Sequence, residues 1–350
     1  MTLLGGEQVW SASRFGHDYP VSLSETLSAV DQQIAHGAVD GFRPLRLGFS
    51  PLDEILGGGM RSGDLMIVGG AYGVGKTIFA LQAARNVASQ GPDSWALYIC
   101  YEHEPAHLMS RLLCLESAVL GLRQDAFTLR KLDALMYQDA GGHGLVAQLR
   151  RSPRYARVLE AMQAYTERLV FVRASGNTGT VTRIREWVDE LRSRGATRIL
   201  VAVDYVQKIP ISQTNIDTEE ERTILVIQAL KELAISTGSR VLGLAAMTQR
   251  GLQSRRMRLT DLRGGTALQY EADIGLVLHN KHDIVSREHL VYNANDAEQM
   301  RRWLVMSVEK NRAGASASDL EFPLDAAHFY IVPEGNYVRD RLVDERIVLE

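Results

Sequence analysis

Apolar residues are concentrated in short, almost continuous runs that recur along the chain. Six of these runs lie at 65–69, 95–101, 168–173, 198–205, 240–247 and 274–279. Stretches with helical periodicity separate most of the runs. Short apolar strands that alternate with helices are typical of an α/β fold with a mostly parallel sheet covered by helices on both faces. Two more strands, near 302–310 and 328–333, are predicted to form a C-terminal edge.

A different pattern precedes residue 48. Residues 1–20 are predicted to be a loose tail, and residues 21–47 a linker made of one helix and a loop. In the helix, at 22–36, Ser22 and Glu25 fit a capping box. Its apolar side chains lie on one stripe, formed by Leu23, Leu27, Val30 and Ile34. Such a stripe must be buried. The simpler interpretation is burial against its own domain, and the more specific alternative is burial against a neighbouring subunit.

The remaining sequence is assigned to one domain, residues 48–335, followed by a C-terminal tail at 336–350. Within the domain, residues 125–152 are polar and contain several glycines. We therefore interpret them as a surface insertion.

The composition is that of an ordinary soluble protein. The 350 residues have a formal net charge of −3, so a contact with nucleic acid must use a local basic patch. The two cysteines, Cys100 and Cys114, are not spaced as a metal site and are expected to be buried thiols in a reducing compartment. No apolar run has the length of a membrane span, and the N-terminus lacks the pattern of a signal peptide, so a cytoplasmic location is expected.

The segment 69–77, GGAYGVGKT, carries the first candidate chemistry. It contains the pattern G-x-x-x-x-G-K-[ST], with an apolar strand directly before it and a helix directly after it. Glycines allow backbone N–H groups to surround a phosphate, and the helix N-terminus adds a favourable dipole. Lys76 would contact the β- and γ-phosphates, and Thr77 would ligate Mg²⁺. The predicted nucleotide-contacting residues are Gly70, Ala71, Tyr72, Gly73, Val74, Gly75, Lys76 and Thr77.

Three other strand ends carry polar groups that suit an ATP site. Asp204 ends the run at 198–205, where a phosphate-loop protein places its carboxylate on the Mg²⁺ side. Glu102 follows another strand, so it is a candidate for activating the attacking water, the alternative being a solvated carboxylate. Gln249 follows a third strand, and its amide is a candidate partner for the γ-phosphate or the water, the alternative being a surface side chain.

The segment 103–107, HEPAH, matches the zinc-protease pattern H-E-x-x-H. That pattern needs both histidines on one face of a helix. Here Pro105 interrupts the first turn, directly after the strand that carries Glu102. We therefore expect no zinc chemistry at this motif.

In their order, these motifs resemble the C-terminal ATPase domain of DnaB-family replicative helicases, within the RecA-like superfamily, from about residue 20 to 333. YEHEPAHLMSRLLCLES resembles the strand and helix that carry the general base, which maps to Glu102. ILVAVDYVQKI resembles the Mg²⁺-site strand, and LTDLRGGTALQYEADIGLVLH is similar to the DNA-side loop and the strand after it. The resemblance implies a RecA-like phosphate-loop fold, hydrolysis of ATP with Mg²⁺, a homo-oligomer that is expected to be a hexamer, and single-stranded DNA as a partner.

The segment VMSVEKNRAG resembles the family strand whose Lys-x-Arg pair acts across a subunit interface. It implies that Lys310 and Arg312 are supplied in trans to a neighbour's γ-phosphate. Residues two apart in a strand share a face, so both cations can point the same way. Without the resemblance, the simpler interpretation is an edge strand protected by charges against aggregation.

Arginines are dense in RGLQSRRMR, at 250–258, and no aromatic residue lies between them. They suit phosphate contacts rather than base readout, the alternative being a solvated mobile loop. The candidate nucleic-acid residues are Arg250, Arg255, Arg256, Arg263 and Gly264. Two features depart from the family here: Arg-Gly-Gly-Thr at 263–266 replaces the usual bacterial Arg-Glu-Ser-Gly, and the segment 249–261 looks shortened. The family's N-terminal helical domain also has no counterpart in the expected organisation.

Two functions of different classes fit these motifs. The first is a ring-shaped, ATP-driven nucleic-acid motor of the DnaB type, which the DNA-side loop favours. The second is a regulatory or scaffold ATPase in the manner of KaiC-like proteins, whose nucleotide state controls assembly without unwinding. Both groups share the segment SPLDEILGGGMRSGD, so it does not distinguish them. A recombination-type filament is a third possibility, which the position of the Lys-x-Arg pair disfavours.

Overall fold

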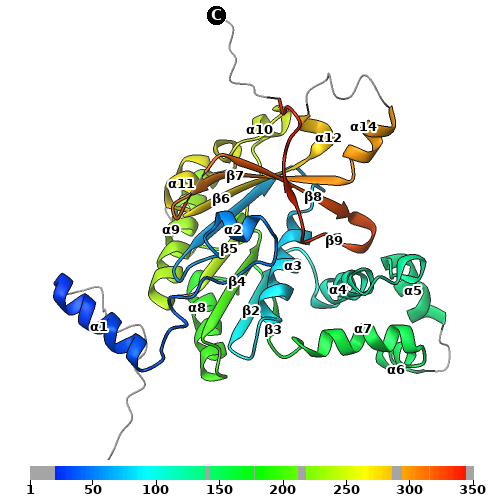
Figure 1. Ribbon diagram of the computed structural model, residues 1–350, viewed down its shortest axis with the longest axis horizontal. Helices are drawn as coiled ribbons and strands as arrows, with labels where there is room; N and C mark the ends of the chain where they lie inside the picture. Colours follow the sequence, from blue (N-terminus) through cyan, green and yellow to red (C-terminus); the bar gives the residue numbers. More distant parts are fainter. Residues whose placement is uncertain are drawn as a thin grey trace, which may run out of the picture.

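One twisted sheet runs through the computed structural model, which describes residues 20–138, 142–176, 178–211, 218–285, 294–314 and 316–343 (Figure 1). Six parallel strands lie in the order β6-β1-β5-β4-β2-β3. Their bounds are β1 Leu65–Gly70, β2 Ser94–Cys100, β3 Leu169–Arg173, β4 Arg198–Asp204, β5 Arg240–Leu244 and β6 Ile274–Asn280. Because these strands are parallel, their carboxyl ends all lie at the same edge of the sheet.

Antiparallel strands extend the sheet beyond β6. Strand β7 (Trp303–Asn311) pairs with β6 on one side and with β8 (Ser318–Asp325) on the other. Strands β9 (Tyr330–Ile331) and β10 (Asn336–Tyr337) both pair with β8. The predicted C-terminal edge is therefore wrong at 302–310, because β7 is an interior strand. For the same reason, Lys310 and Arg312 do not protect an edge strand.

Helices cover both faces of the sheet, so the predicted fold class is confirmed. Helices α3 (Lys76–Ala88) and α4 (Pro105–Val119) pack on one face, and α8 (Val181–Ser193) and α9 (Glu219–Thr237) on the other. In β1, Met66 and Val68 belong to the first core, whereas Leu65 and Ile67 belong to the second. Strands buried on both faces need apolar residues at nearly every position, which explains the continuous runs.

Three further helices enlarge the α4 side of the molecule (Figure 1). They are α5 (Leu129–Gln138), α6 (Leu145–Arg150) and α7 (Pro153–Gln163). Leu132 and Leu149 are fully buried among them. The segment 125–152, interpreted as a surface insertion, therefore contributes to a core. Its charged residues lie mainly on the exposed sides of these helices. The segment therefore has a polar composition, although each helix also has an apolar side.

Both ends of the domain extend beyond the predicted boundaries. Leu45 is fully buried and pairs with Met60, so the packed body begins before residue 48. At the other end, β10 and a bridge from Leu342 to Val285 tie residues 336–343 to the body, although the sequence assigned them to a tail. Residues 344–350, and the predicted N-terminal tail up to residue 19, lie outside the described residues.

Helix α1 (Leu23–Ala35) stands apart from the body (Figure 1). Its predicted capping box is confirmed, because Ser22 and Glu25 each accept a hydrogen bond from the other's backbone N–H. None of its residues is buried, and the side chains of Leu23 and Leu27 are 76% and 62% exposed. The apolar stripe therefore has no cover within the described residues of its own chain.

The described residues also form five short α-helices: α2 (Leu52–Ile55), α10 (Gln249–Gln253), α11 (Gly265–Glu271), α12 (Lys281–Ile284) and α14 (Ala294–Met300). They further form four single-turn 3-10 helices, at Arg123–Asp125, Val206–Lys208, Leu259–Asp261 and Ala326–His328. Among all the helices described, none combines the length and the apolar content needed to cross a bilayer.

A buried ion pair joins α3 to α4. The guanidinium of Arg85 donates to both carboxylate oxygens of Glu116, at 2.6 and 2.8 Å, and the Tyr165 hydroxyl donates to the same carboxylate at 2.8 Å. The Glu116 side chain is fully buried. Removing one partner of such a pair leaves a charge in the core without compensation, which is costly.

We therefore expect Arg85→Met to lower the free energy of unfolding by roughly 3–5 kcal/mol, since it leaves the Glu116 carboxylate buried without a cation. Arg154→Met removes an exposed pair with Asp125 and should cost less than about 1 kcal/mol. Urea unfolding monitored by circular dichroism measures both values. Equal losses in the two variants would contradict the assignment of the buried pair.

Candidate active site

The phosphate loop connects β1, in the middle of the sheet, to the start of α3. Gly70 has φ +146, and a Cβ there would lie 2.6 Å from the carbonyl oxygen of Leu278, so only glycine fits. Gly75, with φ +113, is the N-cap of α3, and no side chain caps this helix. The first-turn N–H groups of α3 are therefore available to an anion.

The Lys76 ammonium lies inside this loop. It donates hydrogen bonds of 2.8 Å to the carbonyl oxygens of Gly70 and Ala71. Burial lowers the pKa of Lys76, and the carboxylates of Asp204 and Glu102 oppose that shift. Together with the hydrogen bond between Thr77 and Asp204, these electrostatic effects indicate that Lys76, Asp204 and Glu102 lie at one site.

Asp204 ends β4 and is only 3% exposed. The Thr77 hydroxyl donates to its Oδ2 atom at 3.0 Å, and the Tyr98 hydroxyl donates to the same atom at 3.0 Å. A threonine hydroxyl beside a carboxylate provides the hard oxygen ligands that Mg²⁺ prefers. These residues therefore fit a magnesium ion shared with a phosphate.

Glu102 lies just beyond the end of β2, which is the neighbour of β4. Cys100 is in register with Asp204, and the Tyr101 N–H donates to the Asp204 carbonyl oxygen at 2.9 Å. Partial burial raises the pKa of Glu102, and the Asp204 carboxylate raises it further, while Lys208 and Lys76 lower it. A carboxylate with a raised pKa, next to the phosphate loop, is a suitable general base.

Gln249 is the first residue of α10, after β5, and its side chain is exposed. Strand β5 lies beside β1, so Gln249 is at the same edge of the sheet as the phosphate loop. The Thr248 hydroxyl caps α10 by accepting a hydrogen bond from the Gly251 N–H. A contact between the Gln249 amide and a phosphate remains a prediction.

The histidines of the zinc-like motif do not share a helical face. Helix α4 begins at Pro105, so His103 precedes it, and the two imidazole rings stack with centroids 4.9 Å apart. Over the parts of the chain that the structure describes, no group of three or more His, Cys, Asp or Glu side chains is arranged to hold a metal.

Lys310 and Arg312 lie at the opposite edge of the sheet from the phosphate loop. Asn311 pairs with Ile274, and Ile274 pairs with Met66, whereas the loop starts at Gly70. Four strand residues span about 13 Å, which is more than the reach of an arginine side chain. In the described chain, Lys310 and Arg312 both donate to the Tyr270 carbonyl oxygen, at 3.0 and 2.6 Å, so they do point the same way.

The candidate DNA-side arginines differ in their surroundings. Arg256 donates to both carboxylate oxygens of Asp319, at 2.7 and 2.8 Å, and its side chain is only 10% exposed. Its predicted role in nucleic-acid contact is therefore corrected: this arginine anchors the loop to β8. Arg263 pairs with Glu219 at 2.9 Å and is 40% exposed.

The other candidate positions are on the surface or at a turn. The side chains of Arg250 and Arg255 are exposed. Gly264, with φ +82, is the N-cap of α11, and a Cβ there would lie 2.5 Å from a methyl group of Thr223. A glycine is therefore required at this point for the loop to pass over α9.

Three residues in or near this site carried no functional prediction. Tyr98 was counted as an ordinary apolar strand residue. Lys208, in the turn after Asp204, lowers the pKa of Glu102. The Gln207 side chain accepts from the Ala246 N–H and donates to the Arg263 carbonyl oxygen, both at 3.2 Å. The polar residues at 207–208, right after a strand-end carboxylate, were the available signal for two of them.

A phosphate loop after the central strand β1, with carboxylates at the carboxyl ends of β4 and β2, defines a phosphate-loop nucleotide-binding protein with a RecA-like core. The chain belongs to the DnaB-like helicase C-terminal domain family, whose sequence model matches residues 45–330. It is 25% identical over 260 residues to "Replicative DNA helicase DnaC" of Bacillus subtilis, covering 73% of this chain and 51% of that protein. It is 26% identical over 234 residues to "Replicative DNA helicase DnaB" of Geobacillus stearothermophilus, covering 66% of this chain and 46% of the relative. The chain thus spans about half the length of these curated relatives.

Solved structures have the same fold. One of them, an ATPase domain, superposes with a TM-score of 0.69 at 19% identity, over 90% of this chain and 99% of that one. A DnaB-like replicative helicase, solved in a study of its interactions with primase, superposes with a TM-score of 0.66 at 18% identity, over 90% of this chain and 67% of that one. At these identities, the likeness supports the fold alone.

We expect Lys208→Met to move the acid limb of the pH–rate profile of ATP hydrolysis to higher pH. A general base must be unprotonated, so the rate falls as pH drops through the pKa of Glu102. Loss of the Lys208 charge raises that pKa further. The kcat/KM for ATP, measured against pH, reports the shift.

Two variants control this measurement. Lys131→Met removes a cation from α5, away from the site, and should leave the profile unchanged. Glu102→Gln should retain Mg·ATP binding and lose turnover, because the amide keeps the shape and lacks the base. An acid limb that stays in place in Lys208→Met would rule out Glu102 as the titrating base.

Proposed function

We propose that this chain is the ATP-hydrolysing subunit of a ring-forming, hexameric DnaB-like helicase or translocase that acts on single-stranded DNA. ATP is hydrolysed at the interfaces between subunits. The observation that carries the proposal is the placement of the phosphate loop and of Lys310 with Arg312 at opposite edges of one sheet. A complete hydrolytic site then needs two copies of the chain.

Each subunit supplies the binding half of the site. The phosphate loop binds Mg·ATP, and Lys76 exchanges its two carbonyl partners for phosphate oxygens. Thr77 and Asp204 hold the magnesium ion, which neutralises charge on the phosphates. Glu102 accepts a proton from the attacking water, and Gln249 is placed to contact the water or the γ-phosphate. Family membership and the hydrogen bond between Thr77 and Asp204 support these roles.

The neighbouring subunit supplies the cations. Arg312 is 52% exposed and is held by Tyr270 and Asp273, at the edge that its own nucleotide cannot reach. Placed against a neighbour's loop, its guanidinium stabilises charge in the transition state, which contributes on the order of 10³–10⁵ in rate. A single subunit is then a poor ATPase, and assembly activates it.

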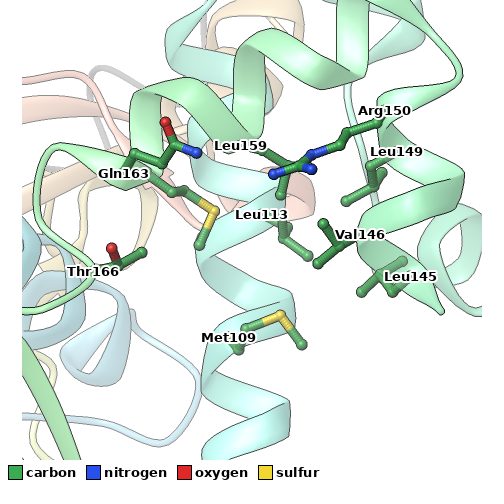
Figure 2. Close-up of a pocket in the computed structure, with 10 residues that line it drawn as sticks. Met109, Leu113, Leu145, Val146, Leu149, Arg150, Leu159, Gln163 and Thr166 are labelled. Atoms are coloured by element: carbon green, nitrogen blue, oxygen red, sulfur yellow. The ribbon is translucent and has the colours of Figure 1, made fainter.

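Two apolar surfaces that no described residue of the chain covers support assembly. One is the α1 stripe. The other is an apolar cavity of about 270 Å³ between α4, α6 and α7, whose lining includes Met109, Leu113, Val146 and Leu159 (Figure 2). Figure 1 shows α1 and this helical layer on opposite sides of the molecule. We infer that the α1 stripe of one subunit docks in the cavity of the next, which closes a ring by head-to-tail contacts.

The exposed arginines after β5 are the proposed contact with single-stranded DNA. Arg250 and Arg255 carry this role, with Arg263 at the next turn. Arg256 and Arg263 are engaged with acids of their own chain, and this observation keeps the alternative open, a KaiC-like regulatory ATPase that binds no strand. The dependence of ATPase turnover on DNA distinguishes the two functions.

We expect single-stranded DNA to increase ATPase turnover, with a stimulation that falls steeply as salt rises. The double variant Arg250→Ala with Arg255→Ala should weaken DNA binding and reduce the salt slope by about one per lost phosphate contact. Arg157→Ala, on α7, is the matched control. Turnover that is insensitive to DNA at low salt, in an assembled wild-type protein, would favour the regulatory ATPase.

Shared sites predict that two inactive variants complement each other. Lys76→Ala has a defective loop and an intact cation pair, and Arg312→Ala has the reverse. In a randomly mixed ring, about one interface in four pairs an intact loop with an intact arginine. Turnover of the mixture should therefore exceed that of either variant. A mixture no more active than its two components would contradict the proposal, as would an active monomer.

Docking of α1 predicts that a charge on its stripe weakens assembly. Leu27→Glu should lower the oligomer mass measured by light scattering, because burial of this leucine contributes on the order of 1–2 kcal/mol. Val146→Glu, on the rim of the cavity, should have the same effect. Gln32→Glu places the same charge on the polar face of α1 and serves as the control. An unchanged mass in both stripe and rim variants would exclude this docking.

A further inference from the structure

Tyr98 is a polar group inside an otherwise apolar part of the core. It lies on β2, in register with Ala202 of β4, and is fully buried. Its ring packs edge-on against Phe171, with centroids 6.0 Å apart. Its hydroxyl donates to Oδ2 of Asp204. A buried tyrosine hydroxyl needs a partner, and here the partner is the carboxylate of the candidate magnesium site.

Burial and the neighbouring carboxylate both favour the neutral, donating form of this hydroxyl. Burial raises the pKa of Tyr98 well above its usual value, and the Asp204 carboxylate raises it further. The hydrogen bond between a neutral phenol and a carboxylate is charge-assisted and correspondingly strong.

Two hydroxyl groups meet on one oxygen of Asp204. Thr77 and Tyr98 both donate to Oδ2, each at 3.0 Å, so the rotation of the carboxylate is fixed from two directions. Among the contacts of the described residues, Oδ1 accepts no hydrogen bond and remains available. Thr77 is also expected to ligate the metal, whereas Tyr98 has no second role. Tyr98 is therefore the partner that holds Asp204 in place even when the Thr77 hydroxyl binds the metal.

We propose that Tyr98 is a positioning residue that orients the Asp204 carboxylate toward the divalent cation, so that Mg²⁺ affinity at the nucleotide site depends on a phenol hydroxyl in the core. This inference rests on the proposed nucleotide site. Residues that orient a metal-binding carboxylate change metal affinity by about 10–100-fold when they are removed.

The test is nucleotide binding by full-length Tyr98→Phe as a function of Mg²⁺, followed with a fluorescent ADP. Phenylalanine keeps the ring and removes only the hydroxyl. We expect the Mg²⁺ concentration for half-maximal binding to rise about 10-fold, while affinity measured in EDTA stays unchanged. The same midpoint as in the wild type would overturn the inference. Equal weakening with and without Mg²⁺ would also overturn it, because it would indicate a structural effect on the whole loop.

Tyr165→Phe is the matched control. It removes the hydroxyl of another buried tyrosine, one that donates to the Glu116 carboxylate, away from the site. Its Mg²⁺ midpoint should equal that of the wild type, and an equal shift would overturn the inference by assigning the effect to core stability.

A double-mutant cycle shows whether Tyr98 acts through Asp204. In an Asp204→Asn background, adding Tyr98→Phe should leave the Mg²⁺ midpoint unchanged, whereas an independent effect would add to it. The failures of the two proposals are distinguishable. If the wild-type chain binds no nucleotide, both proposals fail. If the wild type binds nucleotide in a Mg²⁺-dependent way and Tyr98→Phe has the same Mg²⁺ midpoint, only this inference fails.

Discussion

The direction of the strands decides at which ends of the strands the candidate site residues lie. Six strands run parallel, so the phosphate loop, Glu102, Asp204 and Gln249 all lie at one edge. Strand β7 runs antiparallel to its neighbour β6. Lys310 and Arg312, at the end of β7, therefore lie at the other edge. The separation between the phosphate loop and the two cations is set by the hydrogen-bonded pairing of the strands rather than by flexible side chains. In the described chain, the two cations therefore lie away from the phosphate loop of the same subunit.

Asp273 organises the second edge. Its carboxylate accepts from the Leu65 N–H at 2.8 Å, from the Lys231 ammonium at 2.6 Å and from the Arg312 guanidinium at 3.0 Å. The first strand of the core, the helix α9 and the proposed trans arginine are thus joined at one buried acid. An arginine held in this way loses less conformational freedom when it meets a phosphate, which favours a defined geometry at a subunit interface.

How much of this could be predicted from the sequence depended on the range of the interactions. The phosphate loop and Asp204 were predictable, because a strand, a glycine turn and a helix are local features with a fixed order. Strand β8 was missed, since its burial alternates between buried and half-exposed positions and its apolar signal is weak. Arg256 was misassigned for a similar reason. Its partner Asp319 lies 63 residues away, and no local pattern distinguishes an arginine that anchors a loop from one that faces a ligand. Tyr98 shows the same limit, because it meets Asp204 only when the fold pairs β2 with β4.

The second edge and the DNA-side loop meet in α11. This seven-residue helix begins at the Gly264 turn, directly after Arg263, and it ends beside the Tyr270 carbonyl oxygen that accepts from both Lys310 and Arg312. Its start is fixed to α9, because Gly264 passes within contact distance of Thr223. Arg263, one of the residues proposed to bind DNA, and the carbonyl oxygen that holds the cations proposed to act on the neighbour's nucleotide therefore lie at the two ends of one short helix.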